Sequence, residues 1–358
     1  MDNLKAFTPL SKLGEFGVIN HLTKDIELKQ PGSLVGIGDD ACVLKFEDDR
    51  VLVTTDMLIE GIHFNLIYTP LKHLGYKAAM VNFSDIFAMN ATPRQILVSL
   101  GISAKFSLEH LEEFYEGIKL ACAVYNVDLV GGDTNPSLTG LVISVTVIGD
   151  AMSEDIVYRN GAQEKDLICV SGDLGAAYLG LQILEREKKL FQENSNFQPK
   201  LEGYDYVLER QLKPEARGDI PKLLREINVK PTAMIDISDG LSSEILHICN
   251  LSDRGCKIYQ DKIPVLQETE KVAEELNLDP TTCALNGGED YELLFTASIK
   301  DFGALSLQPQ IHIIGHINPA ETGTNLIGMN GESIPLRAQG WNGLSQDHHS
   351  GSGRSNPL

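Results

Sequence analysis

Positive charge is scarce in this chain. Lys and Arg together number 30, against 50 Asp and Glu residues, and the formal net charge is −20 at pH 7. Nucleic acid is therefore not an expected partner, because binding to backbone phosphates depends on Lys and Arg side chains. A cleft lined by so many acids would also repel an anionic substrate, unless metal ions come between the two.

Long hydrophobic runs are also absent from the sequence. The longest strongly apolar stretch, residues 141–149, is interrupted by Ser144 and Thr146 and is far too short to span a bilayer. The residues after Met1 do not lead into the apolar segment of a signal peptide. The six cysteines form no Cys-x-x-Cys pair, which is typical of reduced core residues in a cytosolic protein. We expect a soluble, cytoplasmic protein that binds no membrane.

Several familiar enzyme motifs are missing as well. The chain has no Gly-x4-Gly-Lys-Ser/Thr loop and no His-Glu-x-x-His, and Gly36-Ile-Gly38 lacks the third glycine of a dinucleotide-binding motif. No Ser/His/Asp or Cys/His arrangement indicates a nucleophile with its base. We therefore predict no residue that acts as a catalytic general base.

What the chain does contain is a series of acidic motifs in apolar, glycine-flanked surroundings. Each is expected where a strand runs into a loop or a helix, and an unpaired charge would be costly there. Hard divalent cations are the simplest partners that would satisfy so many carboxylates together. The motifs are Gly36-Ile-Gly-Asp-Asp40, Thr54-Thr-Asp56, Asn82-Phe-Ser-Asp85, Gly131-Gly-Asp-Thr134, Asp236-Ile-Ser-Asp-Gly240 and Gly287-Gly-Glu-Asp290.

The hydrophobic pattern predicts two α/β halves in a chain of 358 residues, which is long enough for two domains. We place an N-terminal domain at residues 1–150, a C-terminal domain at 151–344 and a disordered tail at 345–358. Residues 191–203 are polar and indicate a loop. β-rich runs predict strands at 51–55, 95–100, 127–130, 141–148, 166–171, 233–236, 291–297 and 311–315.

One helix carries its own functional signal. Leu71, Leu74, Ala78 and Val81 follow each other at steps of three and four, and the next position on this stripe is Asp85. A carboxylate thus replaces the core residue expected at the end of the helix. An inward-facing metal ligand would give this pattern.

Each signal has an ordinary structural explanation beside the functional one. Gly131–Thr134 indicates a turn where backbone N–H groups can approach phosphate, but Gly-Gly-Asp also makes simple turns. Ser238 or Asp239 would be an ordinary N-cap of the next helix, which does not exclude metal binding. Taken singly, the remaining candidates are a strand-end turn at Thr54–Asp56, a structural or surface histidine at His63, a solvated arginine at Arg159 and a packing residue at Trp341.

Taken in order, the motifs resemble those of thiamine-monophosphate kinases. The resemblance covers roughly residues 14–341. The most specific stretches are Ile235-Asp-Ile-Ser-Asp-Gly-Leu241 and Gly287-Gly-Glu-Asp-Tyr-Glu-Leu293. The wider superfamily includes aminoimidazole ribonucleotide synthetase and selenophosphate synthetase. The resemblance implies an α/β (α+β) protein of two domains in the aminoimidazole ribonucleotide synthetase-like architecture. It further implies a homodimer formed through the N-terminal sheet, with ATP held at the junction of the two domains.

The same resemblance implies a role for each matching residue. Gly132, Asp133, Arg159 and Ser238 would bind ATP, and His63, Glu289 and Trp341 would contact thiamine monophosphate. The chain departs from the family pattern after Gly340, where it runs into a polar tail. The residues that would hold several Mg²⁺ ions are Asp40, Thr54, Thr55, Asp56, Asp85, Asp133, Asp236 and Asp239.

The implied reaction is transfer of the γ-phosphoryl group of ATP to thiamine monophosphate, giving thiamine diphosphate and ADP. A phosphate monoester is largely dianionic at neutral pH, so the acceptor needs no base. Two like charges about 4 Å apart repel by roughly 4 kcal/mol at an effective dielectric constant near 20, and Mg²⁺ would offset this. The alternatives are another ATP-dependent superfamily enzyme, such as a cyclo-ligase or a selenophosphate synthetase, and a non-enzymatic acidic metal-binding module.

Overall fold

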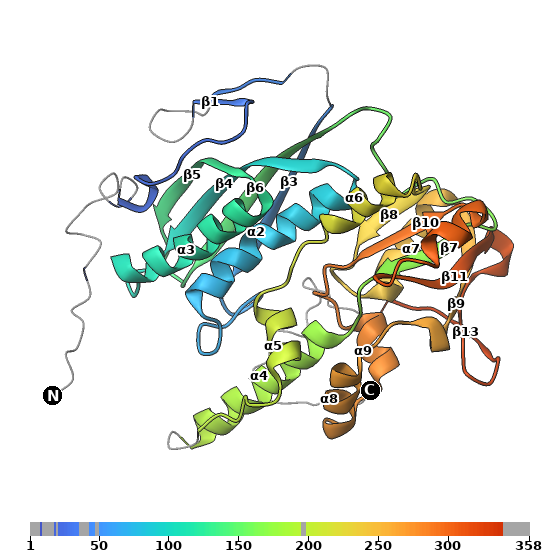
Figure 1. Ribbon diagram of the computed structural model, residues 1–358. Coiled ribbons are helices and arrows are strands. Elements are labelled where there is room, and N and C mark those ends of the chain that lie inside the picture. Colours follow the sequence, from blue (N-terminus) through green and yellow to red (C-terminus); the bar gives the residue numbers. More distant parts are fainter. Residues whose placement is uncertain are drawn as a thin grey trace.

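The computed structural model describes Thr8, Val18 and residues 21–35, 43–46, 50–194 and 198–338. Two separate sheets organise the chain, one in each half of the sequence (Figure 1). A short pair of strands, β1 (Ser33–Val35) and β2 (Val43–Leu44), lies outside both sheets. The predictions for Asp40, Trp341 and the tail at 345–358 fall outside the described residues.

The first sheet has four strands in the order β3-β6-β4-β5. Adjacent pairs are antiparallel except β4 and β5, which are parallel. Side chains alternate between the two faces, so Leu52 and Leu58 of β3 are buried while Val53 and Met57 are 63% and 54% exposed. The strands are β3 (Arg50–Ile59), β4 (Thr92–Ile102), β5 (Asp128–Pro136) and β6 (Val142–Ala151).

Two helices cover the buried face of this sheet, α2 (Leu71–Ala88) and α3 (Leu108–Tyr125). They cross closely because both contact points are glycines. A Cβ on Gly75 would lie 2.0 Å from the carbonyl oxygen of Phe114, and one on Gly117 would lie 2.0 Å from that of Lys72. The predicted helix is confirmed: Leu71, Leu74 and Ala78 of its stripe are buried, Val81 and Asp85 are half-buried, and α2 ends three residues after Asp85.

The second sheet has seven strands in the order β13-β12-β9-β11-β7-β10-β8. Its core has two sides: α7 (Leu241–Ser252) packs on one, and α6 (Asp219–Glu226) with α10 (Phe302–Leu305) packs on the other. The strands are β7 (Leu167–Ser171), β8 (Ala233–Asp236), β9 (Arg254–Tyr259), β10 (Leu293–Ala297), β11 (Ile311–Pro319), β12 (Thr324–Ile327) and β13 (Ser333–Pro335).

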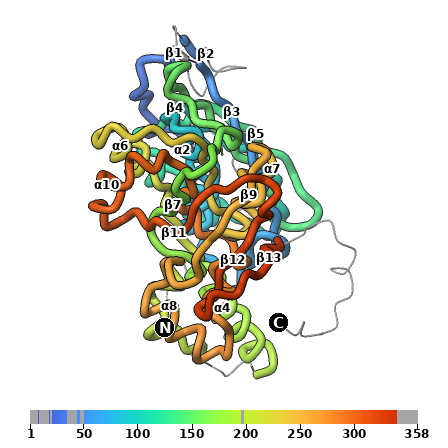
Figure 2. The backbone as a smooth tube through the Cα atoms, turned by 90° about the vertical axis from the view of Figure 1, so that its right-hand side faces the viewer, coloured from blue at the N-terminus to red at the C-terminus, as the bar shows by residue number. Residues whose placement is uncertain are grey.

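A helical group projects from the second half with a small core of its own. Figures 1 and 2 show α4 and α8 extending away from both sheets. Helix α4 continues to Glu193, so the loop predicted from residue 191 was wrong for its first three positions. The members are α4 (Ala176–Glu193), α5 (Asp205–Leu212), α8 (Gln267–Glu275) and α9 (Pro280–Asn286).

The mixed α/β class predicted from the sequence is confirmed, and all eight predicted strands are present, seven with shifted ends and the one at 233–236 with the predicted ends. The exact domain boundaries stay a prediction. Three short 3-10 helices complete the described elements: η2 (Gln260–Lys262), η3 (Ile299–Asp301) and η4 (Ala320–Thr322). None of the helices in the described ranges is long and apolar enough to cross a bilayer.

Candidate functional site

The acidic motif on β3 faces helix α2. Thr54 donates a hydrogen bond from Oγ1 to Oδ2 of Asp85 at 2.5 Å, and Asp56 follows two positions along on the same face of the strand. Thr55 faces the other way, and its Oγ1 donates to the carbonyl oxygen of Val145 at 3.0 Å. The prediction that this motif ends its strand was wrong, because pairing with β6 continues to Ile59.

The second half of the chain brings a further acid to this place. Asp236, the last residue of β8, is 4% exposed and accepts a hydrogen bond from Oγ of Ser84 at 2.7 Å. Ser84 precedes Asp85 on α2. Strand β3, helix α2 and strand β8 therefore converge, and we call Asp56, Asp85 and Asp236 the junction acids.

The junction acids are electrostatically strained. Burial, together with the charge of Asp85, raises the pKa of Asp56 to about 6 and that of Asp236 to about 7. Burial also raises the pKa of Asp85, against the hydrogen bond from Thr54 and the charge of Arg159. Oδ2 of Asp56 is buried and has no hydrogen-bond partner among the residues that the structure describes. Unpaired carboxylate oxygen at this depth is expensive unless a cation satisfies it.

The donor atoms fit a hard divalent cation, since they are carboxylate and hydroxyl oxygens. Over the ranges that the structure describes, no group of three or more His, Cys, Asp or Glu side chains could hold a metal ion by itself. Mg²⁺ typically takes only one or two carboxylates and completes its shell with water and substrate phosphate. The junction acids are thus compatible with Mg²⁺ that arrives together with a phosphate ligand.

Ser238 and Asp239 follow the junction acids along the chain, and both are exposed. The capping explanation for them is wrong, because the residue at the N-cap of α7 is Gly240 and no side chain caps the helix. The N–H of Asp239 instead donates to Oε1 of Glu244 at 3.0 Å. Glu244 is 2% exposed, and burial raises its pKa to about 8.

Glu244 was not among the residues predicted from the sequence. It lies on α7 beside the buried Leu241 and Ile245, so it is an acid on an apolar helix face, as Asp85 is on α2. The same signal that indicated Asp85 would have found it.

Gly132 and Asp133 lie within β5, so the prediction of a turn was wrong here, and their role in binding phosphate stays a prediction. Gly132 pairs with Val98, which pairs with Val145, which pairs with Asp56. Gly132 and Asp56 are therefore three strand spacings apart, or roughly 14 Å. Asp133 is exposed on the edge strand, and the structure does not bring it to the junction acids within one chain.

Glu289 lies on a loop that is bonded to the Asp236–Asp239 segment. The N–H of Glu289 donates to the carbonyl oxygen of Ser238 at 2.7 Å, and that of Tyr291 donates to Ile237 at 2.9 Å. His63 is half-buried, and burial lowers its pKa while the charge of Glu289 raises it. The structure therefore brings His63 and Glu289 into one neighbourhood beside the junction acids.

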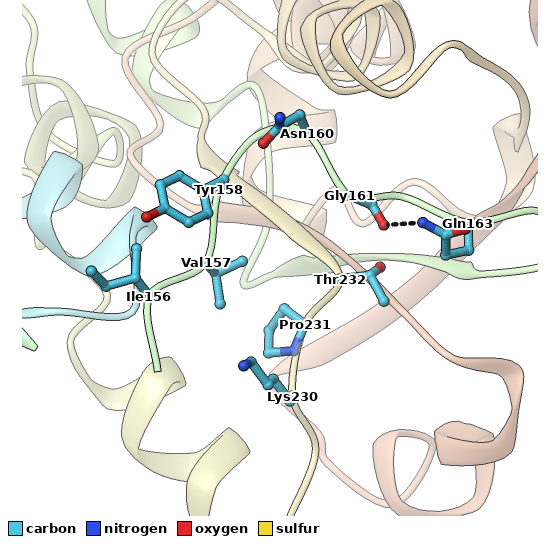
Figure 3. Close-up of a pocket in the computed structure, with 9 residues that line it drawn as sticks. All are labelled: Ile156, Val157, Tyr158, Asn160, Gly161, Gln163, Lys230, Pro231 and Thr232. Carbon is cyan, nitrogen blue, oxygen red and sulfur yellow. Dashed lines mark hydrogen bonds between the residues drawn. The ribbon is translucent and has the colours of Figure 1, made fainter. Parts of the chain in front are cut away.

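Arg159 is exposed, in the segment that follows β6. Its neighbours Tyr158 and Asn160 line a pocket of about 390 Å³ together with residues 230–232, which precede β8 (Figure 3). The segment is fixed there because the N–H of Met234 donates to the carbonyl oxygen of Tyr158 at 3.1 Å. None of the junction acids lines this pocket, so it is separate from the site described above.

The fold and the site first indicate the broad class of protein to which this chain is similar. Residues 38–151 match the family model for the AIR synthase related protein, N-terminal domain. The whole architecture is also found in a solved thiamine-monophosphate kinase from Stenotrophomonas maltophilia, with a TM-score of 0.74 at 30% identity, covering 90% of this chain and 98% of that one.

Comparison with curated proteins identifies the family within this class. The thiamine-monophosphate kinase of Aquifex aeolicus is 37% identical over 288 residues, covering 80% of this chain and 87% of that protein. An Aquifex structure described as complexed with AMPPCP and TMP matches with a TM-score of 0.70 at 32% identity, covering 93% of this chain and 97% of that one. The chain belongs to the thiamine-monophosphate kinase family, whose members are ATP-dependent kinases. The resemblance found in the motifs is thereby confirmed.

Proposed function

We propose that this chain transfers the γ-phosphoryl group of ATP to thiamine monophosphate in one in-line step, without a phosphoenzyme. The observation that carries the proposal is the convergence of Asp56 and Asp85 with Asp236, next to the loop that bears Glu289. Donor and acceptor groups need to meet at one place, and this is where the two halves of the chain meet. The Aquifex relative complexed with AMPPCP and TMP supports the choice of ligands.

In this proposal, different residues bind the two substrates. We assign Arg159 and the exposed Ser238 to the ATP phosphates, and His63 and Glu289 to the acceptor. The acceptor phosphate is already a dianion near neutral pH, so no side chain has to remove a proton from it. The protein's contribution is then position and charge.

We assign Mg²⁺ binding to the junction acids, with Asp40, Thr54, Thr55, Asp133 and Asp239 as further ligands implied by the family. When bound, Mg²⁺ would neutralise phosphate charge that the acids would otherwise repel. The buried, unpartnered Oδ2 of Asp56 supports this assignment. Thr54 holds the carboxylate of Asp85, and Ser84 holds that of Asp236.

We also propose a homodimer packed through the uncovered face of the four-stranded sheet. Val53 and Met57 expose apolar surface there, although helices cover the opposite face. Asp133 is paired in register with Ser99 on this same face, so a dimer would place it at the interface. Val53→Lys should lower the mass measured by analytical ultracentrifugation, and Val124→Lys should not. Val124 is 60% exposed on α3 and is a matched control.

The deciding assay combines purified protein, thiamine monophosphate, ATP and Mg²⁺, and measures thiamine diphosphate by chromatography. We expect product in the presence of Mg²⁺ and loss of product with EDTA. Turnover of an aminoimidazole ribonucleotide precursor or of selenide instead would assign the chain to another superfamily activity. Cation binding that does not depend on nucleotide, with no turnover, would indicate a metal-binding module.

A further inference from the structure

Helix α2 carries a buried lysine that none of the roles above uses. Lys77 is 3% exposed, although a charged lysine is rarely buried without a partner. Its Nζ lies 3.1 Å from Oε1 of Glu289 and donates a hydrogen bond to the carbonyl oxygen of Gln211 at 3.0 Å. The helix that carries Asp85 therefore reaches across to the acceptor side of the site.

Gln211 holds the other oxygen of the same carboxylate. It is 5% exposed on α5, and its Nε2 donates to Oε2 of Glu289 at 2.7 Å. The two oxygens of Glu289 are thus fixed by two different elements, one from each half of the chain. Its side chain is still 30% exposed, and a carboxylate has about four acceptor sites, so it can also bind a ligand.

The backbone at Glu289 is strained in support of this orientation. Its φ is +59°, a left-handed conformation that costs a non-glycine residue free energy. The next residue, Asp290, is fully buried and anchors the loop by accepting the N–H of Gly175 at 2.8 Å. A strained residue whose side chain is clamped and yet accessible is more typical of a binding group than of a packing residue.

Stability gives no sufficient reason for the ion pair. Replacing a buried ion pair with apolar residues of similar volume is often neutral or stabilising, because both charges must be desolvated. An apolar contact between α2 and α5 would join the two halves as well. Only the charged arrangement holds the Glu289 carboxylate ionised and in one fixed orientation.

We propose that Lys77 and Gln211 are positioning residues for the kinase reaction. Together they hold the Glu289 carboxylate ready for the acceptor and tie its position to the helix that bears Asp85. The inference rests on the proposed function, in that it takes Glu289 as the group that meets thiamine monophosphate. The polar contacts of Lys77 and Gln211 described above are with each other and with Glu289, and none is with a residue assigned to ATP.

The test separates the two substrates. Lys77→Met keeps the aliphatic stem and removes the charge, so KM for thiamine monophosphate should rise on the order of tenfold, as for loss of one charge-assisted hydrogen bond. KM for ATP should change less than twofold. Lys72→Met, on the exposed side of the same helix, is the matched control because its ion pair with Glu116 is exposed at both ends. An equal rise in both KM values would overturn the proposal.

A double-mutant cycle tests whether Lys77 acts through Glu289. In a Glu289→Gln background, adding Lys77→Met should raise the acceptor KM less than twofold further. Multiplication of the two single effects would refute the inference and leave Lys77 a packing residue. If Lys77→Met does not fold, Gln211→Met decides: a severalfold rise in acceptor KM alone supports the clamp, and no rise refutes it. Wild-type protein is assayed first, since absence of thiamine diphosphate there would reject the proposed function itself.

Discussion

Replacing Glu244 with glutamine measures how costly the charge near the site is to the folded protein. The change removes the negative charge and keeps an oxygen that can accept the N–H of Asp239. Among the described residues Oε2 of Glu244 has no hydrogen-bond partner, so the bond accepted at Oε1 does not offset the cost of burying the ionised group. The variant should therefore respond to pH differently from the wild type.

The sign follows from the two pKa values. The carboxyl group has an ordinary pKa of 4.5, and burial raises its pKa to about 8 in the folded chain. Below its ordinary pKa the carboxyl group is protonated in both the folded and the unfolded chain, so it costs the folded state no stability. Between the two values folding takes up a proton, so the stability of the wild type falls as pH rises, and the loss is complete above about 8.

The magnitude follows from the same numbers. From pH 6 to pH 8 the loss is two pH units, or roughly 3 kcal/mol of unfolding free energy at about 1.36 kcal/mol per unit. Glu244→Gln should be spared this loss. A buried amide N–H without a partner costs about 1–3 kcal/mol, but equally at both pH values. The comparison between pH values therefore isolates the charge.

The assay is urea unfolding in EDTA at pH 6.0 and pH 8.5, followed by circular dichroism. We expect the difference between variant and wild type to move in favour of the variant by roughly 3 kcal/mol at the higher pH. Glu116→Gln, with a side chain that is 62% exposed, is the matched control. The same difference at both pH values would show that Glu244 is solvated, and the reasoning from burial would fail.

Three further outcomes are expected. Asp85→Ala should abolish thiamine diphosphate formation while circular dichroism stays native, and activity within a few-fold of wild type would make Asp85 a structural residue. Gly132→Ala should lower the unfolding free energy by about 3 kcal/mol, because its Cβ would lie 1.9 Å from the carbonyl oxygen of Val98. Thermal melting checks this. The control is Gly131→Ala, whose Cβ would have its nearest contact at 3.4 Å. Arg217→Met removes one of the two arginines that pair with the buried Glu292 and leaves it Arg210 and the hydroxyl of Ser171; calorimetry should record a loss of about 3 kcal/mol in unfolding free energy.

Local pattern was sufficient where the functional residue interrupts a regular periodicity. Asp85 was found because it takes a core position on the stripe of α2, and the structure places it between Thr54 and Asp236. The mixed α/β class was also predicted from a local pattern, namely short β-branched runs between helices. Glu244 carries a similar signal on α7, where it lies beside the buried Leu241 and Ile245.

Pattern failed where long-range pairing decides the local structure. Gly131–Thr134 looks like a turn, and it is strand only because β4 pairs with it along its length. Lys77 looks like an ordinary helix residue, since nothing nearby in the sequence indicates that Glu289, more than 200 positions away, will meet it. Such contacts depend on how the two halves pack, which short motifs do not encode.

The two backbone hydrogen bonds from Glu289 to Ser238 and from Tyr291 to Ile237 have a further consequence. Under the proposed roles, they join the loop that contacts the acceptor to the loop that contacts the nucleotide through the main chain, so the spacing between the two ligands would be fixed. An acceptor with one more phosphate would overlap the group being transferred. The enzyme should then stop at one addition, and no thiamine triphosphate should accumulate when thiamine diphosphate is supplied with ATP.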